Sequence, residues 1–239
     1  MQRSATTWLA LGGLALVAVI AVLVVNSLTD GVDAAIIALI RQPALDAPLA
    51  PLAVITELGS TWAVTAVALV LFAVLTLRGN PRWGIASGLT IGLASLLNSG
   101  FKRLIERVRP DALEPLVVEH GFSFPSGHSM LGMAAWGIVA VLVARSDLPV
   151  ALRRTLVGGC VVLVGLIGVS RVYLGVHYPS DVLAGWIAGG VIVLLYAAVT
   201  RRLAGPELSD DVSAAPAERA AEAAGEDPGA PRSDPPAPR

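Results

Sequence analysis

Charged residues are scarce in this 239-residue chain. Asp, Glu, Lys and Arg together make up 15% of it, hydrophobic residues make up 55%, and the mean hydropathy is +0.72. An ordinary soluble domain carries about 25% charged residues, so this composition excludes that class and indicates an integral membrane protein. The formal net charge is -1, and the basic residues are dispersed among apolar runs. Nucleic-acid binding needs a basic patch or stripe, so no nucleic-acid partner is expected.

Cysteines and zinc-binding motifs are also nearly absent. Cys160 is the single cysteine and lies inside an apolar run, which excludes an intramolecular disulfide and favours a small hydrophobic packing residue. The chain has no HExxH motif and no pair of cysteines for a zinc site. We therefore expect neither a metal ion nor any other cofactor.

Long apolar runs dominate the chain and predict an all-α bundle of six membrane-spanning helices. The expected spans are about residues 8–27, 61–78, 83–105, 128–145, 150–170 and 180–200. The first run is longer than the apolar part of a usual signal peptide and no clear cleavage site follows it, so we interpret it as a span. Residues 28–59, with a predicted helix from Asp30 to Arg41, are expected to form a short extramembrane helical connection between the first two spans.

Composition divides the chain into two parts. Residues 1–203 are expected to form the six-helix transmembrane domain. Residues 204–239 are rich in Ala, Pro, Gly and acidic residues and have almost no apolar bulk. Such a segment cannot bury enough apolar surface to fold, so we predict a disordered acidic tail.

The basic residues indicate how the chain is oriented in the membrane. Eight arginines flank the face on which both termini would lie: Arg3, Arg78, Arg82, Arg145, Arg153, Arg154, Arg201 and Arg202. The positive-inside rule makes this face cytoplasmic, although the bias is convincing only if the basic cluster from 102 to 109 is excluded as a functional site. We expect a multi-pass protein of the cell membrane with both termini cytoplasmic and its active site at the outer face.

The segment from Ser170 to Asp181 lies between the last two spans and contains an arginine, a histidine and an aspartate. If Pro179 begins the next helix, His177 lies just before that helix and Asp181 lies within its first turn. Four residues apart, the two side chains can form a hydrogen bond. Such a bond would determine which imidazole nitrogen carries the proton and leave the other free as a nucleophile or base.

A second polar segment continues from the third span. We expect its helix to end at Arg109, because Pro110 disfavours helix there. Lys102, the only lysine of the chain, and Arg109 are seven residues apart and would share one stripe of such a helix. Two interpretations stand for Arg103 and Arg107, a functional role or a basic collar at the membrane boundary.

A third polar segment opens the fourth span. Ser126 and Gly127 at a helix N-terminus make a suitable anion site, and His128 beside them can donate a proton, although a histidine at a helix start is as often a cap. His120 is interpreted as a loop residue. Together the three segments gather enough cationic groups to favour an anion with more than one charge, such as phosphate.

The three segments resemble the signature of the type 2 phosphatidic acid phosphatases, K-x6-R-P, P-S-G-H and S-R-x5-H-x3-D. They match as Lys102 to Arg109-Pro110, Pro125-Ser126-Gly127-His128, and Ser170-Arg171 to His177 to Asp181. Every signature position agrees, and the resemblance covers about residues 61–200. It implies an integral membrane phosphatase that hydrolyses a lipid phosphate or pyrophosphate without a metal, through a phosphohistidine intermediate.

The resemblance also implies a role for each matched residue. His177 would attack phosphorus, Asp181 would orient it, and His128 would protonate the leaving alkoxide and then activate water. The phosphoryl group would be held by five residues: Lys102, Arg109, Ser126, Gly127 and Arg171.

Other activities stay open at this stage. Relatives of this family include lipid phosphotransferases and soluble vanadium-dependent haloperoxidases, of which six spans disfavour the second. A non-catalytic anion-binding protein or a transporter is a further alternative, but transport calls for polar residues near the bilayer midplane. The lipid partner could be polyprenyl pyrophosphate, phosphatidate, phosphatidylglycerophosphate or diacylglycerol pyrophosphate, and the sequence does not indicate the oligomeric state.

Overall fold

A computed structural model of the chain describes residues 2–41, 49–110, 117 and 119–203. The secondary structure of these residues is helical, with no β-strand, which confirms the predicted all-α fold. The helices are α1 (Gln2–Val25), α2 (Asp30–Ile40), α3 (Leu49–Glu57), α4 (Thr61–Leu77), α5 (Pro81–Ile105), α6 (Gly127–Ala144), α7 (Val150–Tyr173) and α8 (Pro179–Leu203). The predicted tail, residues 204–239, lies outside the described residues.

Local sequence signals determine where several helices begin. Ser60 and Ser126 are the N-cap residues of α4 and α6, and each side chain accepts a hydrogen bond from a backbone N–H of the first turn. Pro81 and Pro179 are the first residues of α5 and α8. Proline suits this position because its φ is already helical and its missing N–H would have no partner in the helix.

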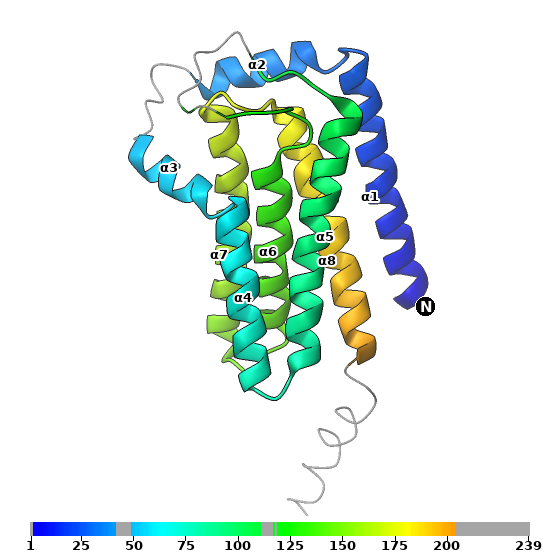
Figure 1. Cartoon of the computed structure of the whole chain (residues 1–239), viewed down its shortest axis with the longest axis vertical. Helices are drawn as coiled ribbons and strands as arrows, with labels where there is room; N and C mark the ends of the chain where they lie inside the picture. The colour runs from blue at the N-terminus through cyan, green and yellow to red at the C-terminus, as the bar shows by residue number, and fades with distance from the viewer. Residues whose placement is uncertain (1, 42–48, 111–116, 118, 204–239) are drawn as a thin grey trace, which may run out of the picture. The chain divides into compact units, whose positions relative to one another are not determined.

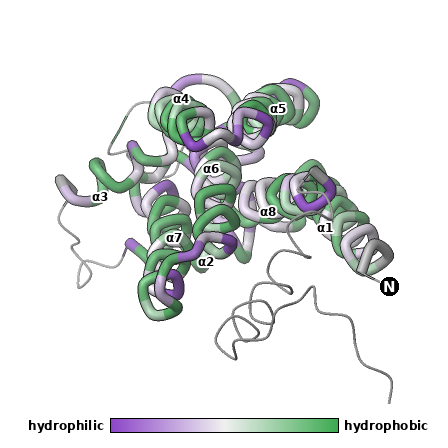
Figure 2. The backbone as a smooth tube through the Cα atoms, turned by 90° about the horizontal axis from the view of Figure 1, so that it is seen from below, coloured by the Kyte–Doolittle hydropathy of each residue, from purple (hydrophilic) through white to green (hydrophobic). Residues whose placement is uncertain are grey.

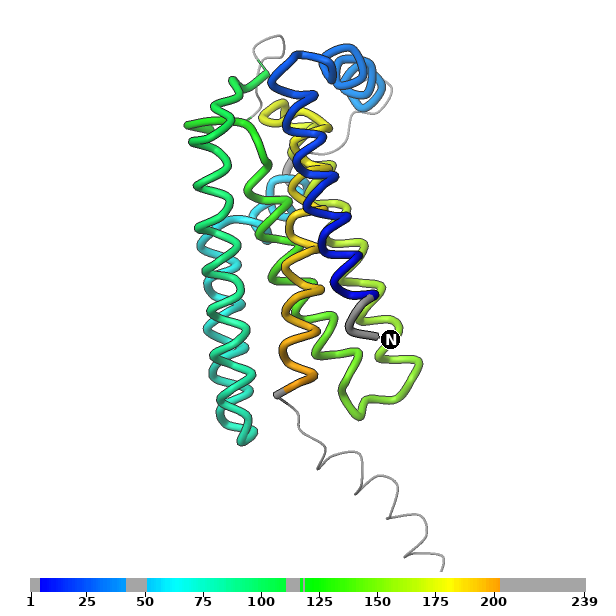
Figure 3. Tube along the Cα trace, turned by 90° about the vertical axis from the view of Figure 1, so that its right-hand side faces the viewer, coloured from blue at the N-terminus to red at the C-terminus, as the bar shows by residue number. Residues whose placement is uncertain are grey.

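Helices α4 to α8 run side by side, with α6 at the centre (Figures 1 and 2). Four apolar side chains of α6 are completely buried: Met130, Ala134, Ala135 and Ile138. They form the main hydrophobic core together with apolar residues of α1, α4, α5 and α8. Helix α1 lies along α8 (Figure 3), and Gly13 packs there against Val191.

Five helices are long and apolar enough to cross a membrane: α1, α5, α6, α7 and α8. Helix α4 has 17 residues and meets the same criterion only together with Pro51–Glu57 of α3, from which it is bent by 54°. With that bent pair taken as one span, the described residues contain six spans, the number predicted, and Pro51–Glu57 then belongs to a span and not to the extramembrane connection predicted for it. Large apolar side chains such as Leu69, Leu89 and Val161 are exposed on the outer faces of these helices, as contact with lipid requires.

The connection between α1 and α4 contains two helices, where the sequence predicts one. Helix α2 lies across the end of the bundle (Figure 1), and Ile37 packs against Val172 and Val182. Helix α3 is not predicted, because three prolines precede or open it. Pro51 falls in its first turn, where proline is tolerated.

Helix α5 ends at Ile105, so the prediction that it continues to Arg109 is wrong. Glu106 has a φ of 50° and a left-handed conformation, which terminates the helix. Arg107 and Arg109 therefore lie on a non-helical segment and do not share a helical stripe with Lys102.

Helices α6 and α8 approach each other closely because α8 has glycines at the contact. A Cβ atom at Gly185 would lie 2.8 Å from the carbonyl oxygen of Ser126, and one at Gly189 would lie 2.6 Å from that of Met130. Both distances are shorter than a carbon and an oxygen allow without movement of the backbone. The two glycines therefore let the first turn of α6 lie directly against α8.

Candidate active site

The predicted histidine and aspartate lie at the beginning of α8. Pro179 is the first residue of this helix, so His177 precedes the helix and Asp181 lies in its first turn, as expected. Asp181 reaches back to accept the backbone N–H of Tyr178 at 2.9 Å, as the acidic residue of a capping box does. Both side chains are buried, with exposed fractions of 2% for His177 and 0% for Asp181.

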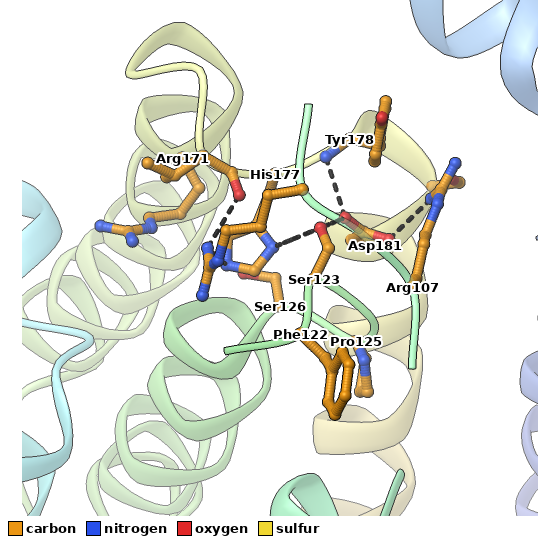
Figure 4. A network of polar contacts seen from close by, with 12 residues as sticks. Arg107, Phe122, Ser123, Pro125, Ser126, Arg171, His177, Tyr178 and Asp181 are labelled. Carbon is orange, nitrogen blue, oxygen red and sulfur yellow. Dashed lines mark hydrogen bonds and ion pairs between the residues drawn. The ribbon is translucent and has the colours of Figure 1, made fainter. Parts of the chain in front are cut away.

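A serine hydroxyl bridges this pair (Figure 4). The hydroxyl of Ser123 donates to Oδ2 of Asp181, and its oxygen lies 3.3 Å from Nδ1 of His177. Nδ1 and Oδ2 themselves are 3.5 Å apart. Because the serine proton is directed to the carboxylate, the serine oxygen can accept the N–H of Nδ1. This arrangement assigns the ring proton to Nδ1 and leaves Nε2 unprotonated.

The other ring nitrogen of His177 faces the guanidinium of Arg109. Nε2 lies 3.4 Å from Nη1 of Arg109. Three backbone carbonyl oxygens hold the Arg109 guanidinium: those of His120, Gly121 and Val176. Nζ of Lys102 donates to the carbonyl oxygen of Phe122. Lys102 and Arg109 therefore reach the same segment even though the helix between them ends early.

Helix α7 continues to Tyr173, beyond its predicted end at residue 170, so Arg171 lies in its last turn. Nη1 of Arg171 donates to the hydroxyl of Thr56 at 3.1 Å, and Nη2 pairs with Glu119. The same carboxylate lies 3.5 Å from Nη2 of Arg109. Nε of Arg171 is buried and has no hydrogen-bond partner among the described residues. A buried donor without a partner is costly, so this nitrogen is suited to bind an anionic ligand.

The first turn of α6 completes the group of predicted residues. The backbone N–H of Ser126 donates to the carbonyl oxygen of Asp181 at 3.0 Å. The hydroxyl of Ser126 accepts from the N–H of Ser129 at 3.4 Å. Gly127 and His128 follow as the first two residues of the helix. The ring of His128 lies within electrostatic range of Arg171, Glu119 and Arg109. All eight predicted site residues are thus brought together at one end of the bundle.

Arg107 belongs to this network, and the collar interpretation does not hold for it. Its guanidinium donates to Asp181 Oδ1 and to the Ser180 hydroxyl, both at 2.7 Å, and to Asp33 Oδ2 at 2.9 Å. It also lies 3.9 Å from the centroid of the Tyr178 ring. Only 9% of its side chain is exposed. A basic residue of a membrane collar would face solvent or headgroups, as the exposed Arg103 does.

Sequence reasoning also missed three residues that the structure places in the site: Ser123, Glu119 and Asp33. Ser123 lies three residues before the predicted anion-binding serine, and nothing in its pattern separates it from other serines. Glu119 and Asp33 bind arginines that are 52 and 74 residues away in the chain, so no local spacing indicates them. The described residues contain no group of three or more His, Cys, Asp or Glu side chains that could hold a metal ion.

Burial and charge determine the protonation of the groups outside the spans. Burial lowers the pKa of His177 to about 4; Asp181 opposes this shift, and Arg171 adds to it. Burial works against ionisation of Glu119, but the Arg171 guanidinium holds the pKa of that carboxyl below its usual range. At neutral pH the His177 imidazole is therefore uncharged and Glu119 is an anion.

Comparison with known proteins relates this arrangement to a family. The PAP2 superfamily matches residues 83–204. Phosphatidylglycerophosphatase B of Bacillus subtilis is 35% identical over 186 residues, which cover 76% of this chain and 88% of that protein. Lipid A 1-phosphatase of Rhizobium etli is 36% identical over 122 residues, 47% of this chain and 48% of that protein.

A solved structure shares the fold as well. The crystal structure of a transmembrane PAP2-type phosphatidylglycerolphosphate phosphatase from Bacillus subtilis matches with a TM-score of 0.70 and 32% identity, over 81% of this chain and 96% of that one. The chain is a multi-pass membrane protein of the PAP2 superfamily. The predicted family is confirmed, and with it the predicted class of enzyme, a membrane phosphatase.

Proposed function

We propose that the protein is a lipid phosphatase that hydrolyses a lipid phosphate or pyrophosphate through a phosphohistidine at His177. The observation that carries this proposal is the orientation of the His177 ring. Nδ1 faces Ser123 and Asp181, whereas the unprotonated Nε2 faces the Arg109 guanidinium at 3.4 Å. A nitrogen lone pair directed at a cationic anion-binding site is what nucleophilic attack on a phosphoryl group requires.

The reaction proceeds in two halves. In the first, the Nε2 lone pair of His177 attacks phosphorus, the bond from phosphorus to the lipid oxygen breaks, and His128 protonates the leaving oxygen. Asp181 and Ser123 hold the Nδ1 proton and stabilise the positive charge that the ring acquires. In the second, His128 takes a proton from water, the water oxygen attacks phosphorus, and the electrons of the P–N bond return to Nε2 as phosphate leaves.

Positive charge at the site stabilises the transferred phosphoryl group. Lys102, Arg109 and Arg171 supply three cationic side chains, and the unpartnered Nε of Arg171 is a donor that a phosphoryl oxygen would satisfy. The N-terminus of α6 adds the hydroxyl of Ser126, the backbone N–H of Gly127 and the positive end of the helix dipole, while the N–H of Ser126 is bound to Asp181. These groups are in place before the reaction, so they stabilise the developing charge without reorganisation.

Phosphatidylglycerophosphatase B of Bacillus subtilis matches this chain over 88% of its own length, and its name makes phosphatidylglycerophosphate the first candidate substrate here. Phosphatidate, polyprenyl pyrophosphate and diacylglycerol pyrophosphate present the same phosphoryl group on an apolar anchor and are the alternatives. In each case the lipid tail would stay among the apolar outer faces of the helices. We place the site at the outer face of the cell membrane and both termini in the cytoplasm, on the distribution of arginines.

Phosphate release from these four lipids, in detergent with excess EDTA, tests the proposal. We expect activity that survives EDTA, falls by at least about a thousandfold in His177→Ala, and falls by roughly a hundredfold to ten-thousandfold in His128→Ala. His120→Ala is the matched control, because this exposed loop histidine contributes only its backbone carbonyl to the site. Activity that disappears with EDTA, or that survives in His177→Ala, would contradict the proposed mechanism.

A further inference from the structure

Arg107 is bound on two sides by buried carboxylates. Its Nη1 donates to Oδ1 of Asp181 at 2.7 Å, and its Nη2 donates to Oδ2 of Asp33 at 2.9 Å. Asp33 belongs to α2 and is 2% exposed. It also accepts the backbone N–H and the hydroxyl of Ser180 in the first turn of α8, at 2.9 and 2.6 Å. Helix α2 thus supplies a carboxylate that both caps α8 and holds the arginine beside Asp181.

The two oxygens of Asp181 have separate partners. Oδ2 accepts the Tyr178 N–H and the Ser123 hydroxyl, on the side that faces His177. Oδ1 accepts from Arg107 (Figure 4). Without the guanidinium, Oδ1 would be a buried charged oxygen that has lost its ionic partner, and the carboxylate would gain by rotating toward other donors. Such a rotation would weaken its hold on Ser123 and on Nδ1 of His177.

We propose that Arg107, held by Asp33, is a positioning residue of the reaction that fixes Asp181 and, through it, the orientation of His177. The inference rests on the proposed function of the site. Arg109 differs from Arg107 because its Nη1 lies beside Nε2 of His177, and Arg171 differs because its buried Nε has no partner among the described residues. The terminal nitrogens of Arg107 instead bind protein side chains, namely Asp181, Ser180, Asp33 and Thr29. Helix α2, which is only a connection in the sequence analysis, thereby contributes to catalysis through Asp33.

An ion pair that merely fastened α2 to the bundle would behave differently. Its loss would lower the thermal stability and the yield of folded protein, but the folded fraction would keep its kcat. A positioning residue that does not contact substrate affects kcat and leaves KM nearly unchanged. The two roles are therefore separated by kinetics normalised to folded protein.

The experiment measures kcat and KM for phosphatidylglycerophosphate and phosphatidate with the full chain in detergent, beside its thermal unfolding midpoint. We expect Arg107→Gln to lower kcat on the order of 100-fold, with KM changed by less than roughly threefold. Arg107→Lys retains one charge but reaches only one carboxylate, so it should recover part of the lost kcat. Arg103→Gln is the matched control, because Arg103 is an exposed arginine in the last turn of α5, four residues before Arg107.

Asp33→Asn tests whether the position of Arg107 depends on α2. It also replaces Arg107→Gln as the test variant if Arg107→Gln does not fold. We expect kcat to fall by roughly tenfold, and the double variant Arg107→Gln/Asp33→Asn to be no slower than Arg107→Gln alone. Wild-type kcat in folded Arg107→Gln, or losses that multiply in the double variant, would overturn the positioning role. Absence of turnover by the wild-type protein on every lipid would instead overturn the proposed function, and the inference with it.

Discussion

Glu119 lies between two of the arginines that would hold the substrate phosphate. It pairs with Nη2 of Arg171 and lies 3.5 Å from Nη2 of Arg109. Its carboxylate is partly buried, with 29% of the side chain exposed. In the substrate-free protein this carboxylate neutralises part of the positive charge of Arg171 and Arg109, the charge that is proposed to bind a phosphoryl group. A substrate must therefore compete with an anion that belongs to the protein.

Glu119→Gln tests this competition. The amide keeps the size of the side chain but removes its charge, so inorganic phosphate and lipid phosphate should bind more tightly. We expect the inhibition constant for phosphate and the KM for lipid to fall by roughly tenfold. The measurement is steady-state kinetics with phosphate as inhibitor, and Asp147→Asn, which changes an acid in the turn between α6 and α7, is the control. A higher KM in Glu119→Gln would instead show that Glu119 orients Arg171 for the substrate.

The protonation of His177 predicts the acid side of the pH profile. Because burial lowers the pKa of His177 to about 4, the ring is a neutral nucleophile above that pH and a protonated, inactive imidazolium below it. The acid limb of kcat/KM should therefore lie near pH 4, and the basic limb should report His128. Rates measured across the pH range for wild type and His120→Ala check this expectation. A rate that still rises at alkaline pH would contradict the role of His128 as the acid.

At the scale of helices, the contact between α6 and α8 sets the geometry of the site. The N–H of Ser126 at the start of α6 donates to the carbonyl oxygen of Asp181 in α8. Gly185 makes room for this contact one turn further along α8. The first turn of α6, which is proposed to bind the phosphoryl group, and the beginning of α8, beside the proposed nucleophile His177, are therefore held at a distance that Gly185 and Gly189 permit.

Gly185→Ala should change that distance. The added Cβ would meet the backbone oxygen of Ser126, which cannot move without shifting the first turn of α6. We expect a loss of about 1–3 kcal/mol of stability from overpacking, together with a lower kcat. Gly190→Ala is the control, because a Cβ at that position has nothing within 4 Å. Thermal unfolding in detergent and phosphate release measure both effects, and equal behaviour of the two variants would contradict the argument.

At the scale of the whole molecule, basic residues divide between the two ends of the bundle. At the end that carries the site, Lys102, Arg107, Arg109 and Arg171 all make contacts within it. Because these four side chains bind within the site, they are left out when the basic residues are counted to assign the membrane orientation. The arginines near the α4–α5 and α6–α7 turns lie at the opposite end (Figure 1), which supports the assignment of that end to the cytoplasm.

Cysteine labelling in intact bacterial cells tests this orientation. In a chain with Cys160→Ala, we expect a membrane-impermeant maleimide to label His120→Cys at the site end. Asn80→Cys, in the α4–α5 turn, should be labelled only after the cells are permeabilised. Both positions are exposed and outside the helices, so access to the reagent depends on the side of the membrane. The reverse pattern would invert the proposed orientation.

Most of the fold was predictable because the signals that make it are local. A span needs a long apolar run, and Pro179 at a helix start determines that His177 and Asp181, four residues apart, lie close together. The end of α5 was not predictable in this way. Glu106 adopts a left-handed conformation that non-glycine residues rarely take, and no residue pattern indicates it.

The eight motif residues of the site follow from spacing and resemblance, whereas their partners depend on tertiary structure. Ser123, Glu119 and the pair of Asp33 with Arg107 meet those residues only because distant helices and loops pack at one end of the bundle. A contact between residues 74 positions apart, such as that of Arg107 with Asp33, depends on how helices are arranged in space. Local sequence determines where the helices and motifs lie along the chain. Only the packing of the helices determines which charged side chains from distant parts of the chain face one another.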